Sequence, residues 1–129
     1  MSFEISWCRP TLHAIGHGEV ITLANAVVRG FDERRVSEHA AVVVGVLALP
    51  YFSPGNVVTK VAAIGARADY YVNGSHTCML ECSGSNDPGN RVESMLKRKQ
   101  RQVLKGKART VWVSVSNFAS RQTALKRVR

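Results

Sequence analysis

Two acidic residues, Asp69 and Glu81, stand in neighbouring segments with strand-like sequences and are the first candidates for chemistry in this chain. Glu81 belongs to MLECSGSND, where an apolar run meets a polar turn that contains a glycine. Burying a carboxylate without a partner costs several kcal/mol, so Glu81 must be neutralised, exposed or bound to something positive. Two converging carboxylates repel each other, and a hard divalent cation such as Mg²⁺ or Mn²⁺ relieves that repulsion. The pair therefore predicts a metal site suited to phosphodiesters.

Whether the two carboxylates meet depends on the hairpin that joins their segments, 68–72 and 76–82. Asn73-Gly74 between them is a strong hairpin signal. If those two residues alone form the loop, Asp69 faces away from Glu81. A three-residue loop, or one bulge, sets Asp69 opposite Met79 and beside Glu81. The metal site requires this second register. The alternative is a strand-edge aspartate paired with Arg67 or Lys60.

Side chains alternate along a strand, so Ser83 shares the face of Glu81, and Cys78 and Cys82 share the other. With Cys8 the chain has three cysteines and no second cluster of metal ligands. This pattern favours reduced thiols over a disulfide or a structural zinc site. We expect a cytoplasmic protein, since no run is long and apolar enough for a membrane helix and the N-terminal residues do not resemble a secretory signal.

The segment DPGNRVESMLKRKQRQVLKG predicts a helix of about fifteen residues. Asn90 and Glu93 have the spacing of a capping box, and Gly106 suits the helix end. Lys99 completes the apolar stripe and therefore points towards the sheet, and Gln102 lies one turn further on the same side. Lys99 either lies along the core edge with its head in solvent or takes part in catalysis. The stripe consists of Val92, Met95, Leu96 and Val103.

Charge is concentrated in the last third of the chain. Residues 1–90 contain six Lys/Arg and eight Asp/Glu, whereas residues 91–129 contain twelve Lys/Arg and one acid, giving a net charge of +9. The asymmetry predicts a polyanionic partner, with nucleic acid ahead of an anionic membrane surface or an acidic protein; a solvated basic face is the alternative. The residues expected to meet phosphates are Lys97, Arg98, Arg101, Lys105 and Lys107.

The remaining segments suggest one domain over residues 1–129. Residues 20–28 have helical spacing, and His13 and His17 nearby are better explained as surface residues than as metal ligands. Residues 37–49 predict a helix with Ser37 as its N-cap and Pro50 as its stop, although the valine run also suits a buried strand. Strands are expected at 57–64 and 110–117, and a basic helix over about 120–129.

The order of these elements around RADYYVNGSHTCMLECSG resembles the core of the PD-(D/E)xK phosphodiesterase superfamily, the restriction-endonuclease-like nucleases, over about residues 35–118. The resemblance implies an α/β (α+β) fold with a mixed sheet of about four strands flanked by helices. It also implies Asp69 and Glu81 as ligands of Mg²⁺ or Mn²⁺ and Glu38 as a third carboxylate. Ser83 stands where the motif has lysine. Some members are thought to supply this lysine from the following helix, which here offers Lys99, then Lys97.

Three functions remain open from the sequence. A metal-dependent nuclease would use Asp69, Glu81 and Lys99. A catalytically inactive nucleic-acid-binding module on the same fold would use only the basic last third. A basic protein-interaction subunit would meet an acidic protein with that surface. A compact nuclease that cuts two strands is expected to be a homodimer. Tyr70 and Tyr71 either stack on a base or pack within the sheet.

Overall fold

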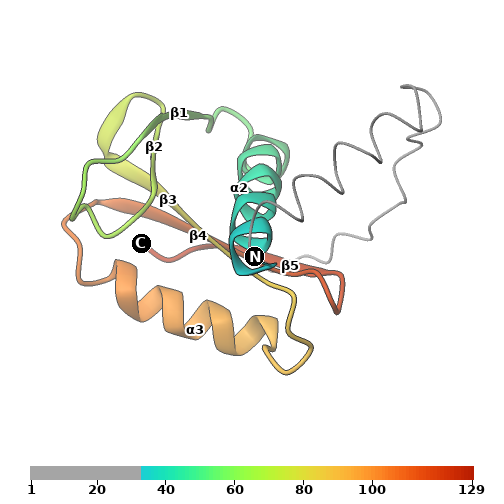
Figure 1. Cartoon of the computed structure of the whole chain (residues 1–129). Coiled ribbons are helices and arrows are strands. Elements are labelled where there is room, and N and C mark those ends of the chain that lie inside the picture. Colours follow the sequence, from blue (N-terminus) through green and yellow to red (C-terminus); the bar gives the residue numbers. More distant parts are fainter. Residues whose placement is uncertain (1–32) are drawn as a thin grey trace, which may run out of the picture.

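The computed structural model describes residues 33–129, and over this range a sheet of five strands lies between two helices (Figure 1). β3 and β4 are parallel and the other neighbouring strands are antiparallel, so the sheet is mixed, as predicted, with one strand more than expected. The strands lie in chain order. The elements are α2 (Glu33–Phe52), β1 (Val58–Val61), β2 (Tyr70–Val72), β3 (Ser75–Ser85), α3 (Val92–Val103), β4 (Thr110–Asn117) and β5 (Gln122–Arg127).

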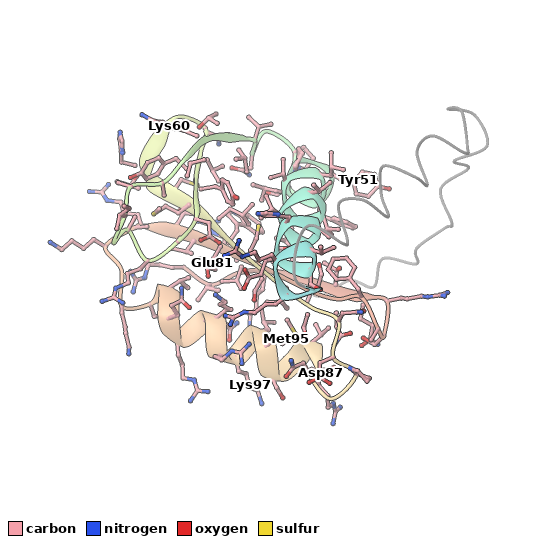
Figure 2. The ribbon with its side chains drawn as sticks, viewed as in Figure 1. Tyr51, Lys60, Glu81, Asp87, Met95 and Lys97 are labelled. Atoms are coloured by element: carbon pink, nitrogen blue, oxygen red, sulfur yellow. The ribbon has the colours of Figure 1, made fainter. Side chains whose placement is uncertain are left out.

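Each face of the sheet packs against one helix, because side chains alternate along β3 and β4. Met79 on β3 and Val113 on β4 belong to the cluster that includes the apolar stripe of α3. Leu80 and Cys82 belong to the second cluster, together with Leu49 of α2. Glu81 therefore faces α3, with its charge on the inner side of the α3 layer (Figure 2).

Two glycines let α2 cross β3 at close range. A Cβ at Gly84 would overlap the carbonyl oxygen of Ser37 and lie 2.8 Å from the Cβ of Ala41. A Cβ at Gly45 would lie 2.6 Å from the Sγ of Cys82. These contacts hold the first turns of α2 beside the end of β3, where the candidate site residues lie.

The prediction of a basic helix over 120–129 is wrong, because this segment forms β5, which pairs antiparallel with β4. Arg121 takes a positive φ of 57°, and Asn117 accepts a hydrogen bond from the backbone of Ser120 at 3.0 Å, so the chain turns back at once. The hydroxyl groups of Thr123 and Ser116 form a hydrogen bond of 2.8 Å between β5 and β4. Pairing with the free edge of β4 and burial of Leu125 outweigh the helical preference of this basic segment.

Several predicted boundaries also differ from the structure. α2 begins at Glu33, so Ser37 is a buried residue within the helix and not its N-cap, and Pro50 lies inside the last turn instead of ending the helix. α3 has 12 residues and its N-cap is Arg91, without a side-chain cap. Asn90 instead donates to the hydroxyl of Ser85 at 2.9 Å, which holds the loop before the helix.

Within residues 33–129 no helix is both long enough and apolar enough to cross a bilayer. The helix predicted at 20–28, the histidines at 13 and 17, and Cys8 lie outside the described residues. Cys78 and Cys82 are free thiols, as expected from the odd number of cysteines.

Candidate functional site

The hairpin between β2 and β3 brings Asp69 beside Glu81 through a bulge. Asn73 and Gly74 form a two-residue turn with positive φ values, and Val72 pairs with Ser75. The next pair joins Tyr71 to Met79, so β3 contains three extra residues at this point. Asp69, just before β2, then lies across from Glu81 rather than Met79. Its backbone N–H donates to Leu80 at 3.1 Å, and its Oδ2 accepts from the Cys82 N–H at 3.1 Å.

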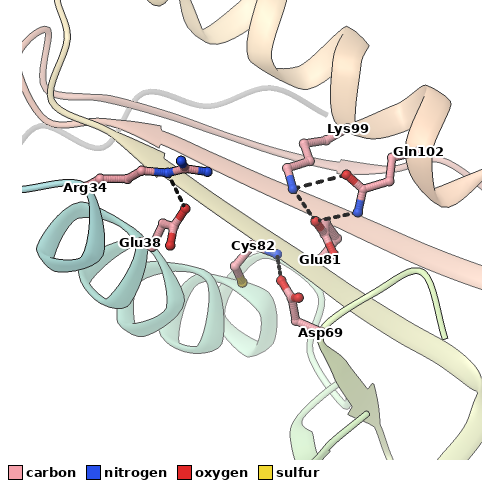
Figure 3. Close-up of polar contacts among 7 residues, drawn as sticks. All are labelled: Arg34, Glu38, Asp69, Glu81, Cys82, Lys99 and Gln102. Atoms are coloured by element: carbon pink, nitrogen blue, oxygen red, sulfur yellow. Dashed lines mark hydrogen bonds and ion pairs between the residues drawn. The ribbon is translucent and has the colours of Figure 1, made fainter. Parts of the chain in front are cut away.

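Glu81 is held by two side chains of α3 (Figure 3). The Lys99 Nζ donates to Glu81 Oε1 at 2.5 Å, and the Gln102 Nε2 donates to the same oxygen at 3.1 Å. Lys99 also donates to Gln102 Oε1 at 3.2 Å, which closes a ring of three hydrogen bonds. The side chain of Glu81 is 2% exposed and that of Lys99 is 20% exposed, so the ammonium can still reach a molecule in the adjoining pocket.

Burial is the main cause that raises the pKa of Glu81 to about 7. The hydrogen bond from Lys99 opposes this rise, and the negative charge of Asp69 adds to it. The proximity of two carboxylates therefore makes one proton easy to retain near neutral pH. A cation bound between the two carboxylates would offset their repulsion and displace that proton.

The second oxygen of Glu81, Oε2, is buried and accepts from no donor group; the carboxyl of Glu81 can hydrogen-bond to Asp69 only when one of the two is protonated, so the ionised form leaves Oε2 without a partner. A buried carboxylate oxygen without a partner is costly, and a cation would satisfy it. Within residues 33–129 no group of three or more His, Cys, Asp or Glu side chains gathers as a metal cage. Two carboxylates are nevertheless sufficient for Mg²⁺, which keeps several water ligands and takes others from substrate phosphates. The donors Asp69 and Glu81 thus fit this ion.

No ion pair within the described residues ties Asp69 to Arg67 or Lys60, the alternative partners considered for it. Glu38 takes a different position from the two central carboxylates. It is exposed on α2 and forms an ion pair with Arg34 at 3.2 Å. The structure brings together Asp69, Glu81 and Lys99, and it places Glu38 at the rim.

An open polar cleft of about 540 Å³ runs from α2 past the end of β3 to α3. Ser83 is half-buried in its wall, with Glu38 on one side and Lys99 and Gln102 on the other. We name this the polar cleft. Its charged and amide-bearing lining residues include Arg34, Asn86, Asn90 and Arg98.

A second pocket, of about 400 Å³, lies on the other side of Glu81. Loop 62–68 forms most of its wall, and the polar part consists of Arg67, Asp69, Tyr70, Glu81 and Gln102. We name this the alanine-lined pocket, because Ala62, Ala63, Ala66 and Ala68 contribute to it. Glu81 and Gln102 face this pocket, Lys99 faces the polar cleft, and Gln102 lines both spaces.

The basic residues proposed to meet phosphates lie on the outer side of α3 and just after it. Lys97 points away from the sheet, whereas Met95 points towards it (Figure 2). Arg98 also lines the polar cleft, which connects the basic surface to the site. The exposed members of this set are Lys97, Arg98, Arg101, Lys105 and Lys107.

Sequence reasoning missed two parts of the site. Gln102 was recognised only as a neighbour of Lys99, although its three-residue spacing and shared face could have indicated a second ligand of Glu81. Loop 62–68 gave no motif, since four alanines and one glycine do not indicate chemistry. Tyr71 contributes to packing near the α3-side core and forms an edge-to-face contact with His76 at 4.5 Å, rather than presenting a free stacking surface.

Comparisons of the chain with protein-family models, with curated proteins and with solved structures find no match. The resemblance to the PD-(D/E)xK superfamily therefore rests on the residues and on the order of the elements.

Proposed function

We propose that this chain is a metal-dependent nuclease that hydrolyses phosphodiester bonds of DNA or RNA. One observation carries the proposal. Asp69, Glu81 and Lys99 come from three separate elements and meet beside two open pockets, and Glu81 Oε2 is buried without a partner. A carboxylate pair in which Glu81 is buried and Asp69 is exposed, with a nearby ammonium, suits a phosphodiester, because the charge that develops on phosphate needs cationic stabilisation.

Asp69 and Glu81 are the residues that would hold Mg²⁺ or Mn²⁺. Such an ion supplies Lewis-acid activation of a phosphate oxygen and lowers the pKa of a bound water. The chain itself supplies orientation and charge. Gln102 and Lys99 both bind Glu81 Oε1, which fixes the carboxylate and leaves Oε2 without a donor. The partly exposed Lys99 ammonium can donate to a phosphate oxygen at the polar cleft.

The basic surface of α3 supports a nucleic-acid substrate. Its exposed lysines and arginines lie on the same helix that supplies Lys99, so a backbone bound along this helix passes the site. Cutting both strands of a duplex would require a homodimer. The free thiols of Cys78 and Cys82 are compatible with the cytoplasm as the compartment.

A non-catalytic nucleic-acid-binding module is the second candidate, and Ser83 favours it. In this alternative the missing motif lysine marks a lost active site, and the Lys99–Glu81 pair is a structural ion pair that compensates a buried charge. Both functions use the same basic surface. They differ in whether Glu81 is needed for a reaction.

Glu81→Gln distinguishes the two candidates. The purified protein is incubated with plasmid and with single-stranded oligonucleotides in Mg²⁺ or Mn²⁺, and cleavage and binding are measured separately. We expect the substitution to reduce cleavage at least about 100-fold while nucleic-acid affinity stays equal or improves, because a negative charge is removed. Glu93→Gln, at an exposed carboxylate of α3, is the matched control.

A readout independent of turnover accompanies this experiment. Mg²⁺ should raise the melting temperature of the wild-type protein but not that of Glu81→Gln, because the ion binds the folded site only. Lys99→Met should reduce cleavage while Lys60→Met, at an exposed lysine of β1, does not. Undiminished cleavage by Glu81→Gln would refute the nuclease proposal and leave the binding module.

A further inference from the structure

Loop 62–68 presents apolar side chains to solvent directly beside the charged site. Ile64 is fully exposed, at 106%, and Val61 is 68% exposed. Both line the alanine-lined pocket, whose floor includes Asp69 and Glu81. An apolar rim next to two carboxylates has no role in holding a cation, so it indicates a ligand with an apolar part.

The loop is fixed by contacts with the elements around it. The Ala62 N–H donates to the Asp69 carbonyl at 2.8 Å, and the Ala63 N–H donates to the Tyr71 hydroxyl at 3.4 Å. Gly106 lies so close to the loop that a Cβ there would be 3.1 Å from the Cβ of Arg67. The apolar rim is therefore built into the fold, in a shape that exists before any ligand binds.

The two spaces beside Glu81 differ in chemistry. The polar cleft contains Arg34, Arg98 and Lys99, which suit phosphate oxygens, together with two acids, Asp87 and the Arg34 partner Glu38. The alanine-lined pocket combines small apolar side chains of loop 62–68 with a polar floor, and its volume of about 400 Å³ accommodates one planar heterocycle. A nucleotide strand has this same division, with charged phosphates on one side and flat bases on the other.

We propose that the alanine-lined pocket receives one unpaired base of the nucleic acid, which packs against Ile64, while the adjoining phosphate lies where this pocket meets the polar cleft, at Gln102. The substrate at this site is therefore single-stranded or locally unpaired. The inference rests on the proposed function for its nucleic-acid ligand, but it concerns binding and does not require cleavage. A base packed on an exposed apolar side chain gains affinity without sequence reading, because every base has a flat apolar face.

The test measures binding of the full chain to fluorescent oligonucleotides in the absence of divalent ions. The probes are a single-stranded oligonucleotide, its duplex, and a series in which one nucleotide at a time is abasic. Ile64→Ser is compared with Val57→Ser, which removes another exposed apolar side chain, 48% exposed, just before the other end of β1. We expect Ile64→Ser to weaken single-strand binding about fivefold or more and duplex binding less than twofold, with Val57→Ser unchanged.

Coupling between the protein and the oligonucleotide decides the interpretation. One abasic position should weaken wild-type binding by a similar factor, and the same position should have no further effect on Ile64→Ser, because both changes remove the same contact. Independent, multiplicative losses would refute the inference. So would equal losses on the duplex, or a change of oligomeric state in Ile64→Ser, which would assign the rim to self-association.

The two proposals fail in different ways. If no substrate is cleaved but the Ile64 coupling is present, the nuclease proposal fails and the base pocket stands. If cleavage depends on Glu81 but the coupling is missing, the nuclease stands without a base pocket.

Discussion

Glu81 has the surroundings of a group that must exchange partners. A carboxylate buried only for structure would use both oxygens in hydrogen bonds from donor groups, whereas here two donors share Oε1, Oε2 has none, and the Asp69 carboxyl can only share a proton with Glu81. Asp69 adds negative charge from the neighbouring strand. The folded protein therefore holds a charged Glu81 at a cost, which makes its stability depend on pH.

The first prediction concerns this pH dependence. The pKa of Glu81 is raised from 4.5 to about 7 in the folded protein, so the folded state binds a proton more tightly than the unfolded state. The stabilising contribution is complete below about pH 4.5 and is lost as the pH rises through about 7. Relative to Glu81→Gln, the wild type should lose about 2 kcal/mol of unfolding free energy between pH 5 and pH 8.

Urea unfolding of both proteins at several pH values without divalent ions measures this difference. Glu93→Gln provides the control at an exposed carboxylate. Parallel curves for the wild type and Glu81→Gln would mean that the carboxylate titrates alike in both states. Added Mg²⁺ should reduce the loss at pH 8, since the ion binds the ionised form.

Individual site residues could be predicted to different extents. Alternation along one strand identified the face of Glu81, and the apolar stripe of α3 identified the direction of Lys99, since both depend on local periodicity. The position of Asp69 depends on a three-residue bulge between β2 and β3, and no local signal gives its size. The two alternatives could be stated from the sequence, but long-range pairing selects between them.

At the scale of elements, the site depends on how closely α2 crosses β3. Gly84 lies against the backbone of Ser37, near the start of α2, and the first turns of this helix carry Arg34 and Glu38 to the polar cleft. A side chain at residue 84 would have to push the helix and the strand apart. Because the neighbour is backbone, it cannot move aside as a flexible side chain would.

The second prediction follows from this crossing. Gly84→Ala should destabilise the protein by about 2 kcal/mol or more, as overpacked cores do. Gly89→Ala is a suitable control, because the nearest atom to a Cβ there is Oδ1 of the Asp87 side chain, at 3.2 Å. Thermal unfolding of both variants tests the difference. Equal melting temperatures would show that α2 is not held as tightly as the contact implies.

Among the elements, α3 and β4 could be predicted because their apolar patterns are regular and their surroundings do not compete. β5 was missed because a basic segment with helix-forming residues was judged by composition. Its structure is decided by the free edge of β4 and by the turn at Arg121, which are tertiary features. The predicted start of α3 was wrong for a similar reason, since the side chain of Asn90 binds Ser85 and does not cap the first turn of α3.

At the scale of the whole molecule, charge and chemistry are placed on one helix. The inner side of α3 holds Glu81 through Lys99 and Gln102, and its outer side carries the exposed cations. A polyanion attracted to the outer side is thereby brought to the polar cleft, which Arg98 also lines. A protein partner would bind the basic surface whether or not the same helix also carried the site residues Lys99 and Gln102.

The third prediction uses the salt dependence of binding. Each phosphate neutralised by a Lys or Arg contributes about 0.7 to the slope of log affinity against log salt for a single strand. Replacing Lys97, Arg101 and Lys105 by glutamine should therefore reduce that slope by about 2 and weaken binding of all sequences alike.

Replacing Lys60 and Arg121, exposed cations away from α3, removes positive charge without touching the proposed surface and should leave the slope unchanged. Fluorescence anisotropy with a single-stranded oligonucleotide between 50 and 300 mM salt provides the measurement. The Debye length shortens about 2.5-fold over this range. A flat response in the wild type would exclude both nucleic-acid functions and favour an acidic protein as the partner, because binding to the densely charged backbone of a nucleic acid releases condensed counterions.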